Sequence, residues 1–299
     1  MSADAGQAID AVNQVFGRHP GFRALHAKGQ LFRGTFKATP EAAALTTAGH
    51  MQGDEIPATF RLSNGAGNPD HPDYAPEPRG FAVKLYLPDG SRTDIVAATA
   101  PLFPVKNPEG FTDFVKLQAA QWKLPLFLIR HPEALRVIPV AAPTLRPPES
   151  YASIPYYAIH AFKWIDAQGT ERYVRYTVLP EGAVRRLSPR DAKRRGRDYL
   201  QTEIQERVAR GPVRFTLELQ IAAPGDPTDD PSRGWPKDRQ RVRAGTFEIT
   251  EPETEREKDG DILVFDPTRV TDGIELSDDP VLRFREQAYG ESVARRTAS

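Results

Sequence analysis

Segments in which apolar and polar residues alternate dominate the middle of this chain, and they constrain its fold more than any other feature. In the clearest one, Val213–Ile221, every odd-numbered residue is apolar, while Arg214, Thr216, Glu218 and Gln220 are polar. Successive side chains of a β-strand point to opposite faces, so this alternation predicts an antiparallel strand with one buried face.

Shorter segments of the same kind predict further strands at residues 31–37, 58–63, 81–87, 94–96, 161–165 and 173–179. Helices are predicted at residues 8–16, 108–122, 191–209 and 280–296, and proline-rich loops at 141–148 and 224–236. Strands in the middle of 299 residues, with helices on either side, predict a single α+β domain, residues 1–299. Its strands are expected to close into an antiparallel β-barrel.

Charge and cysteine content narrow the classes of function. The chain has 40 Lys and Arg against 40 Asp and Glu, so its total charge gives no indication of a nucleic acid or an anionic membrane as partner. It has no cysteine, so a metal would have to bind His, Tyr, Asp or Glu. Neither a signal peptide nor an apolar stretch long enough to span a bilayer is recognisable, and we expect a cytoplasmic protein.

The last predicted helix carries the most suggestive side chains. Arg285, Tyr289, Ser292 and Arg296 are spaced so that they lie along one stripe of a helix. Guanidinium groups beside a phenol favour the phenolate, which is a suitable ligand for ferric iron. On the helix alone, a solvated basic face with one anchoring aromatic residue is the simpler interpretation.

Two histidines could take part in chemistry. His26 stands in a loop before the first predicted strand, and a lone histidine in such a place is more often an ordinary residue than a catalyst. His160 lies within a predicted strand, and we interpret it as a core residue, with a contribution to a nucleotide site left open.

Several motifs, in the same order along nearly the whole chain, resemble the catalase family. They are Arg-Ala-Leu-His-Ala-Lys-Gly at 23–29, Phe-Arg-Leu-Ser at 60–63, Glu-Pro-Arg-Gly-Phe-Ala-Val-Lys at 77–84, Gly-Ile-Glu-Leu-Ser-Asp-Asp-Pro at 273–280, and Arg285-x-x-x-Tyr289. Because the match ends just after the helix of Tyr289, the chain is most similar to the minimal, catalase-related haem peroxidase branch. The resemblance implies a catalase-type barrel with flanking helices.

The resemblance also implies a haem, of the b type, and a role for each matching residue. Tyr289 would bind the iron and Arg285 would stabilise its phenolate, while His26 would transfer the proton of the peroxide and Ser63 would orient His26. The remaining matches contact the haem or its access channel: Arg23, Arg61 and Arg296 would hold the propionates, Phe111 would pack on the porphyrin, and Val96 and Phe103 would line the channel.

The implied activity is the reduction of hydrogen peroxide or organic hydroperoxides by a small organic electron donor, in the response to oxidative stress. One position departs from the family: its distal asparagine is replaced by Ala98, so we expect weak catalase activity. Whether the hydroxyl of Thr99 compensates is left open.

Two alternatives keep the same barrel: an isomerase of fatty-acid hydroperoxides, and a non-enzymatic haem carrier. The resemblance further leads us to expect self-association, as a homodimer.

Overall fold

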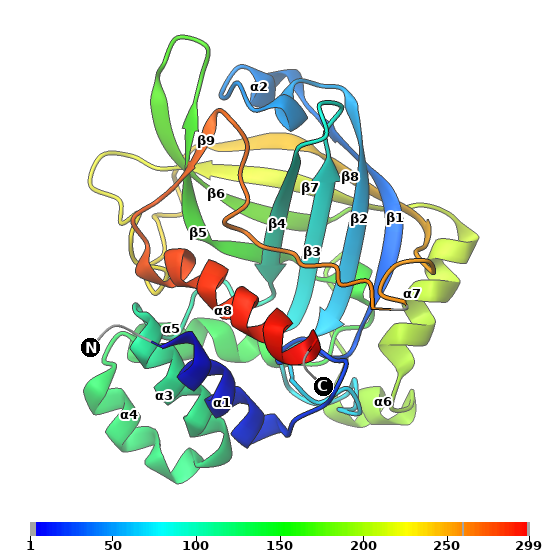
Figure 1. The fold of residues 1–299 in the computed structure, drawn as a ribbon, viewed down its shortest axis with the longest axis vertical. Coiled ribbons are helices and arrows are strands. Elements are labelled where there is room, and N and C mark those ends of the chain that lie inside the picture. Colours follow the sequence, from blue (N-terminus) through cyan, green and yellow to red (C-terminus); the bar gives the residue numbers. More distant parts are fainter. Residues whose placement is uncertain (1–3, 259, 298–299) are drawn as a thin grey trace.

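The computed structural model describes residues 4–258 and 260–297, and its centre is a closed antiparallel β-barrel (Figure 1). The eight barrel strands follow the order β4-β3-β2-β1-β8-β7-β6-β5, and β4 closes the barrel by pairing with β5. A short ninth strand, β9, extends the sheet beside β5. The strands are β1 (Gly29–Ala38), β2 (Glu55–Asn64), β3 (Arg79–Tyr86), β4 (Arg92–Ala98), β5 (Tyr156–Ile165), β6 (Glu171–Pro180), β7 (Val213–Ile221), β8 (Arg241–Pro252) and β9 (Ile274–Leu276). This architecture confirms the predicted fold class.

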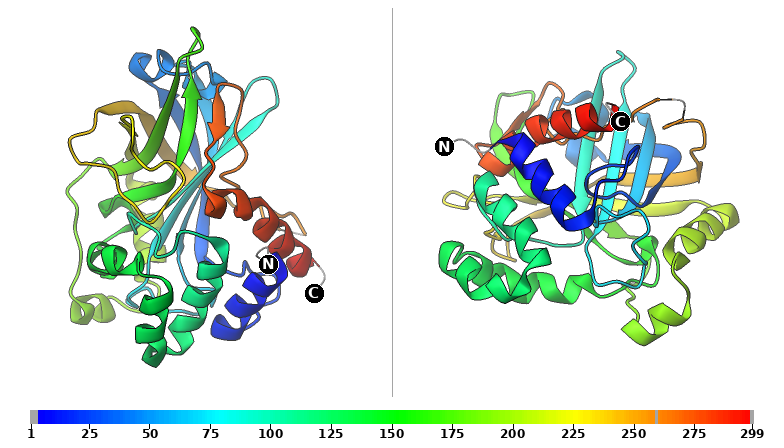
Figure 2. Two further views of the ribbon diagram at one scale, coloured as in Figure 1. Left: turned by 90° about the vertical axis from the view of Figure 1, so that its left-hand side faces the viewer. Right: turned by 60° about the horizontal axis from the view of Figure 1, so that its bottom comes forward.

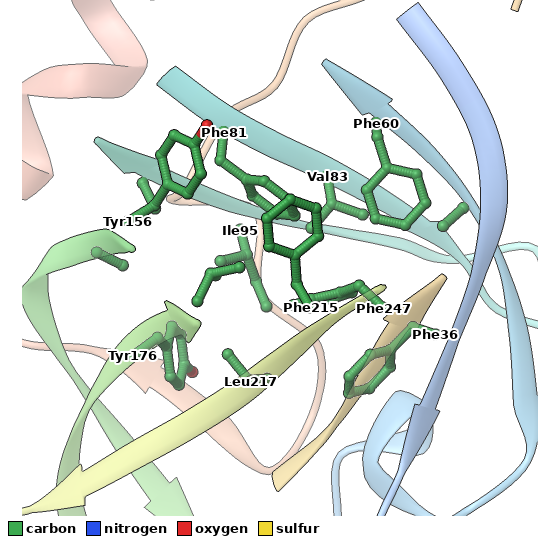
Figure 3. Packing of buried hydrophobic residues seen from close by; sticks show 14 of the residues in the cluster. Phe36, Phe60, Phe81, Val83, Ile95, Tyr156, Tyr176, Phe215, Leu217 and Phe247 are labelled. Atoms are coloured by element: carbon green, nitrogen blue, oxygen red, sulfur yellow. The ribbon is translucent and has the colours of Figure 1, made fainter. Parts of the chain in front are cut away.

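Aromatic side chains fill the interior of the barrel (Figure 3). The ring of Phe81 lies 5.2 Å from that of Phe215 and 5.6 Å from that of Phe247, measured between centroids. Phe60 joins them at 6.0 Å from Phe81. Such tilted and edge-on contacts are favourable for aromatic rings, and rings of this size exclude water from the barrel. The interior is therefore packed core, and a site for a large ligand has to lie outside it.

The helices lie around the barrel and not within it (Figures 1 and 2). The last helix, α8, crosses in front of the barrel, and α1 packs against both α8 and α3. The helices α3, α4 and α5 gather beside α1 at one end of the molecule, and α6 and α7 lie on the other side. The helices are α1 (Ala5–Phe16), α2 (Pro40–Ala43), α3 (Pro108–Ala119), α4 (Leu124–Arg130), α5 (Ala134–Ala141), α6 (Pro189–Arg194), α7 (Tyr199–Arg210) and α8 (Pro280–Thr297).

Three parts of the fold differ from the predictions. The helix expected at 191–209 is two helices, α6 and α7, because Gly196 between them adopts a positive φ of 102°. The helices α2, α4 and α5 and the strands β8 and β9 were not predicted. Within the described part of the chain, no helix has the length and apolar character needed to cross a membrane.

Candidate active site

The outward face of strands β1 to β4 carries several of the predicted site residues. Because side chains alternate along a strand, the residues next to the inward-pointing Phe60 and Phe81 point outward. Two outward rows cross the four strands in register: Gly29, Ser63, Gly80 and Ala98, and Leu31, Arg61, Ala82 and Val96. The chain between β8 and β9 covers part of this face, where Leu263 and Phe265 pack against Val96. Figure 1 shows α8 crossing the same side of the barrel.

His26 approaches this face from a loop with an unusual backbone. Its φ is +56°, in the left-handed region that residues other than glycine seldom adopt. Two backbone hydrogen bonds hold the loop there: His26 N donates to Gly65 O at 3.1 Å, and Ala27 N donates to Ala66 O at 3.0 Å. Backbone held in a sparsely populated conformation by its surroundings is found often at functional sites.

The imidazole of His26 is paired with Ser63. The distance from His26 Nδ1 to Ser63 Oγ is 3.1 Å. Gly80 lies opposite Ser63 on β3, and a Cβ at Gly80 would lie 2.6 Å from Ser63 Oγ and 2.7 Å from His26 Nδ1. Only glycine leaves room for this pair. The arrangement therefore depends on three residues: His26, Ser63 and Gly80.

Burial, and then the charge of Arg61, lower the pKa of His26 from 6.5 to about 4. At neutral pH the imidazole is therefore uncharged. With one nitrogen engaged by Ser63, the other can accept a proton.

Arg23 and Arg296 meet at the carboxylate of Glu257. Arg23 contacts both carboxylate oxygens, at 2.7 and 3.0 Å, and Arg296 Nη2 lies 3.2 Å from one of them. Burial disfavours the charged form of Glu257, but the arginines outweigh it and its pKa is lowered. Glu257 itself has a positive φ of 59°. The cluster thus accepts a carboxylate, which is also the group that a haem propionate presents.

Arg61 lies beside this cluster in a drier environment. It is buried, and its Nη2 donates to the backbone oxygen of Ala27 at 3.3 Å. Burial, and then the charge of Arg23, lower its pKa to about 9. Among the described residues, no carboxylate forms an ion pair with Arg61 within 4.0 Å. A buried cation of this kind is suited to an anionic ligand.

On α8, Tyr289 is the first member of a chain of hydrogen bonds. Arg285 Nη1 donates to Tyr289 Oη at 2.9 Å, and Arg285 Nε donates to His160 Nε2 at 2.9 Å. The other nitrogen of His160 lies 2.6 Å from Asp279 Oδ2. Arginine can only donate, so His160 Nε2 is the acceptor and Nδ1 carries the proton given to Asp279. This chain fixes the direction of the Arg285 side chain.

His160 is therefore not simply the core residue that we expected. It is buried on β5, and its pKa falls to about 4, chiefly through burial, so it stays neutral. Asp279 also caps α8, because its Oδ1 accepts from the amides of Val281 and Leu282 at 2.8 and 3.2 Å. The alternation along β5 shows that His160 is buried, but no pattern in the sequence shows that it meets α8.

The residues predicted to line the channel or to pack on the porphyrin fall into two groups. Val96 belongs to the outward face of β4, next to Ala82 and Phe265. Phe103 and Phe111 stack on each other with ring centroids 6.0 Å apart, in a cluster beneath α3 and α4. The structure therefore brings Phe103 and Phe111 together and assigns Val96 to a different cluster.

The structure also settles the question of Thr99. Its hydroxyl accepts from the amide of Arg79 at 3.1 Å and its side chain is fully buried. Ala98 is on the outward row with Gly80 and Ser63, and the side chain of the following residue turns to the other side. Thr99 does not take the place of the missing asparagine.

Comparisons with known proteins relate the whole chain to one family. A sequence model of the catalase family matches residues 12–299. A protein named catalase-related peroxidase from Mycolicibacterium paratuberculosis is 50% identical to this chain, over 97% of this chain's length and 94% of the relative's length. A second protein of that name, from Synechococcus elongatus, is 32% identical, over 97% of this chain's length and 88% of the relative's length.

Solved catalase structures share the fold. Catalase A from Saccharomyces cerevisiae superimposes with a TM-score of 0.84 at 22% identity, over 96% of this chain and 64% of that chain. A fungal catalase gives a TM-score of 0.83 at 23% identity and is covered to 62%. This chain thus spans less than two thirds of either structure, whereas it spans nearly all of the catalase-related peroxidases. The chain belongs to the catalase family, in its small, catalase-related branch.

Proposed function

We propose that the protein is a haem peroxidase, which reduces hydrogen peroxide or organic hydroperoxides at the outward face of β1 to β4. The observation that carries this is the neutral imidazole of His26, held to Ser63 at 3.1 Å on the face that also presents Arg61. Two relatives, 50% and 32% identical, are named catalase-related peroxidases. Neither name favours an isomerase or a haem carrier.

The donor groups of this face fit haem. Tyr289 would bind the iron, and the hydrogen bond from Arg285 would stabilise its phenolate. Arg23, Arg61 and Arg296 would bind the propionates, since two of them already hold a carboxylate. Phe111 would pack against the porphyrin, while Val96 and Phe103 would border the approach of the substrate. We propose haem b and a small organic molecule as electron donor.

When bound, haem supplies the iron at which the peroxide O–O bond breaks and the redox equivalents that the donor later restores. His26 accepts a proton from one peroxide oxygen and returns it to the other, which leaves as water or alcohol. For this, Nδ1–H of His26 donates to Ser63, and the free lone pair lies on Nε2. Because Ala98 offers no hydrogen bond to the substrate, oxygen release from a second peroxide is expected to be slow.

The test is the rate of reaction with peroxide in a His26→Ala variant after reconstitution with haem. Loss of the acid–base group should lower the rate constant by about 10²- to 10⁴-fold, while the haem content stays unchanged. A His50→Ala variant, which also removes a buried histidine with a pKa of about 4, is the matched control for effects on the fold. Equal rates for wild type and His26→Ala, both with full haem, would contradict the proposal.

A further inference from the structure

Exposed apolar side chains concentrate on one short stretch of the molecule. Among the described residues, nine large apolar side chains are exposed, and seven of them lie between residues 122 and 140. Trp122 and Ile129 are the most accessible, at 79% and 77%. The others in this stretch are Leu124, Leu126, Leu135, Ile138 and Val140. We call these seven residues the apolar patch.

The patch lies on the outer side of α4 and α5 and of the short 3₁₀ turn before them, Gln121–Lys123. These elements stand at one end of the molecule, away from the barrel strands (Figures 1 and 2). Their inner side is already occupied, because Phe127 and Ala134 are buried in a cluster with Val105. The helices are thus apolar on both sides. Packing within this chain explains the apolar residues of the inner side but not those of the outer side.

Exposed basic residues lie in the same stretch of the chain as the patch, although the chain as a whole is neutral. Five exposed lysines and arginines lie between residues 113 and 146: Lys116, Lys123, Arg130, Arg136 and Arg146. The same stretch has only two carboxylates. Glu133 is buried, and Asp113 lies near the side chains of Arg130 and His131. The segment that carries the patch therefore has a local excess of positive charge, although the whole chain is balanced.

We propose that the apolar patch binds the surface of an anionic lipid bilayer. An exposed tryptophan and aliphatic residues, in one segment with exposed lysine and arginine, match the two layers of such a surface: acyl chains and charged headgroups. A second copy of the chain fits less well, because a two-fold contact through this patch would bring the same cations together. Nucleic acid would match the charge but would leave the large apolar side chains in water.

The position of the patch favours substrates that reach the protein from a bilayer. The inner cluster of the same helices includes Phe103, which we expect along the approach to the haem, and Phe111, which we expect against the porphyrin. A bilayer on the outer side would bring lipid hydroperoxides to this end of the molecule. This consequence rests on the proposed function, whereas binding to the bilayer does not.

Vesicle flotation with the haem-loaded, full-length protein tests the proposal. The protein should float with phosphatidylglycerol vesicles at low salt and remain unbound with phosphatidylcholine vesicles. At 1 M salt, where charges are screened beyond roughly 3 Å, binding to phosphatidylglycerol should weaken strongly. Absence of binding to phosphatidylglycerol at low salt would overturn the proposal.

Two sets of variants separate the apolar and the charged contributions. Ile129→Glu should weaken binding by at least about tenfold, whereas Val184→Glu, at an exposed apolar residue outside the patch, should not. Replacing both Lys123 and Arg130 by Gln should weaken binding about thirtyfold, because each removed charge lowers the binding free energy by about 1 kcal/mol. Equal binding of all variants would overturn the proposal.

Size-exclusion chromatography tests whether a second copy of the chain covers the patch in place of a bilayer. The protein is expected to elute as the same species in wild type and Ile129→Glu. If Ile129→Glu instead turned a dimer into a monomer, and neither protein floated with vesicles, the patch would be a contact between two copies and the proposal would fail. Unchanged far-ultraviolet circular dichroism of the variants shows that the fold is intact.

Discussion

Gly80 sets the geometry of the His26–Ser63 pair, because a Cβ atom at this position would collide with both side chains. We expect Gly80→Ala to push the pair apart and to lower the rate constant for peroxide by about tenfold to a hundredfold, with haem still bound. Stopped-flow kinetics of the haem-loaded variant measures this. Gly182→Ala is the control, because a Cβ there meets nothing within 4 Å. An unchanged rate in Gly80→Ala would show that the pair is not needed.

Ala98 offers a test in the opposite direction. Ala98→Asn adds a hydrogen-bond donor on the row of Ser63 and Gly80, so it should raise oxygen release relative to donor oxidation by about tenfold or more. An oxygen electrode and a chromogenic donor measure the two activities on the same sample. If their ratio stays at the wild-type value, Ala98 does not limit oxygen release.

At this scale the sequence names candidate residues but not their contacts. Motif order selected His26, Ser63, Arg285 and Tyr289 as candidates, and the structure pairs the first two and the last two. The contacts of Glu257 and His160 were not predictable, since their partners lie up to 234 residues away along the chain. Only the folded barrel brings such residues together.

Among the elements, α8 depends on Asp279 for its start and for its connection to β5. Asp279→Ala removes a helix cap and leaves buried His160 without its acceptor, so we expect the free energy of unfolding to fall by about 2–4 kcal/mol. Denaturant melts measure this. Asp278→Ala, at an exposed neighbour, should change it by less than about 0.5 kcal/mol. A similar effect of both substitutions would exclude a special role for Asp279.

Elements with regular periodicity were predicted, and those with interrupted periodicity were not. β7 alternates without a break and was recognised, whereas the pairing of β8 with β7 shifts register at Leu217/Glu218, which disturbs the alternation along β8. The helices α4 and α5 have only seven and eight residues and contain Pro125 and Pro139, so they are too short and too interrupted for a helix to be recognised from the sequence.

For the whole molecule, buried neutral histidines predict sensitivity to acid. His26, His50 and His160 all have pKa values lowered from 6.5 to about 4, chiefly by burial. Between these pH values the unfolded chain binds more protons than the folded chain, so stability is lost as the pH falls from 6.5 towards 4. His50 and His160, whose side chains are fully buried, should each contribute roughly 2–3 kcal/mol to this loss, and the partly exposed His26 should contribute less.

Guanidinium melts of the haem-free protein at pH 7 and pH 4.5 measure this loss without a contribution from haem release. His50→Gln removes one of the three groups and lies outside the candidate site, so its stability should fall less over the same interval. Equal stability of the wild type at both pH values would contradict the burial of these histidines in neutral form.

Tyr289 is the proposed ligand of the haem iron, and the optical spectrum of the reconstituted protein tests this role most directly. Wild type and a Tyr173→Phe control should both show a ferric high-spin haem with a tyrosinate ligand, and Tyr289→Phe should lose that spectrum. The same spectrum in wild type and Tyr289→Phe, or no haem binding by the wild type, would contradict the assignment of the site.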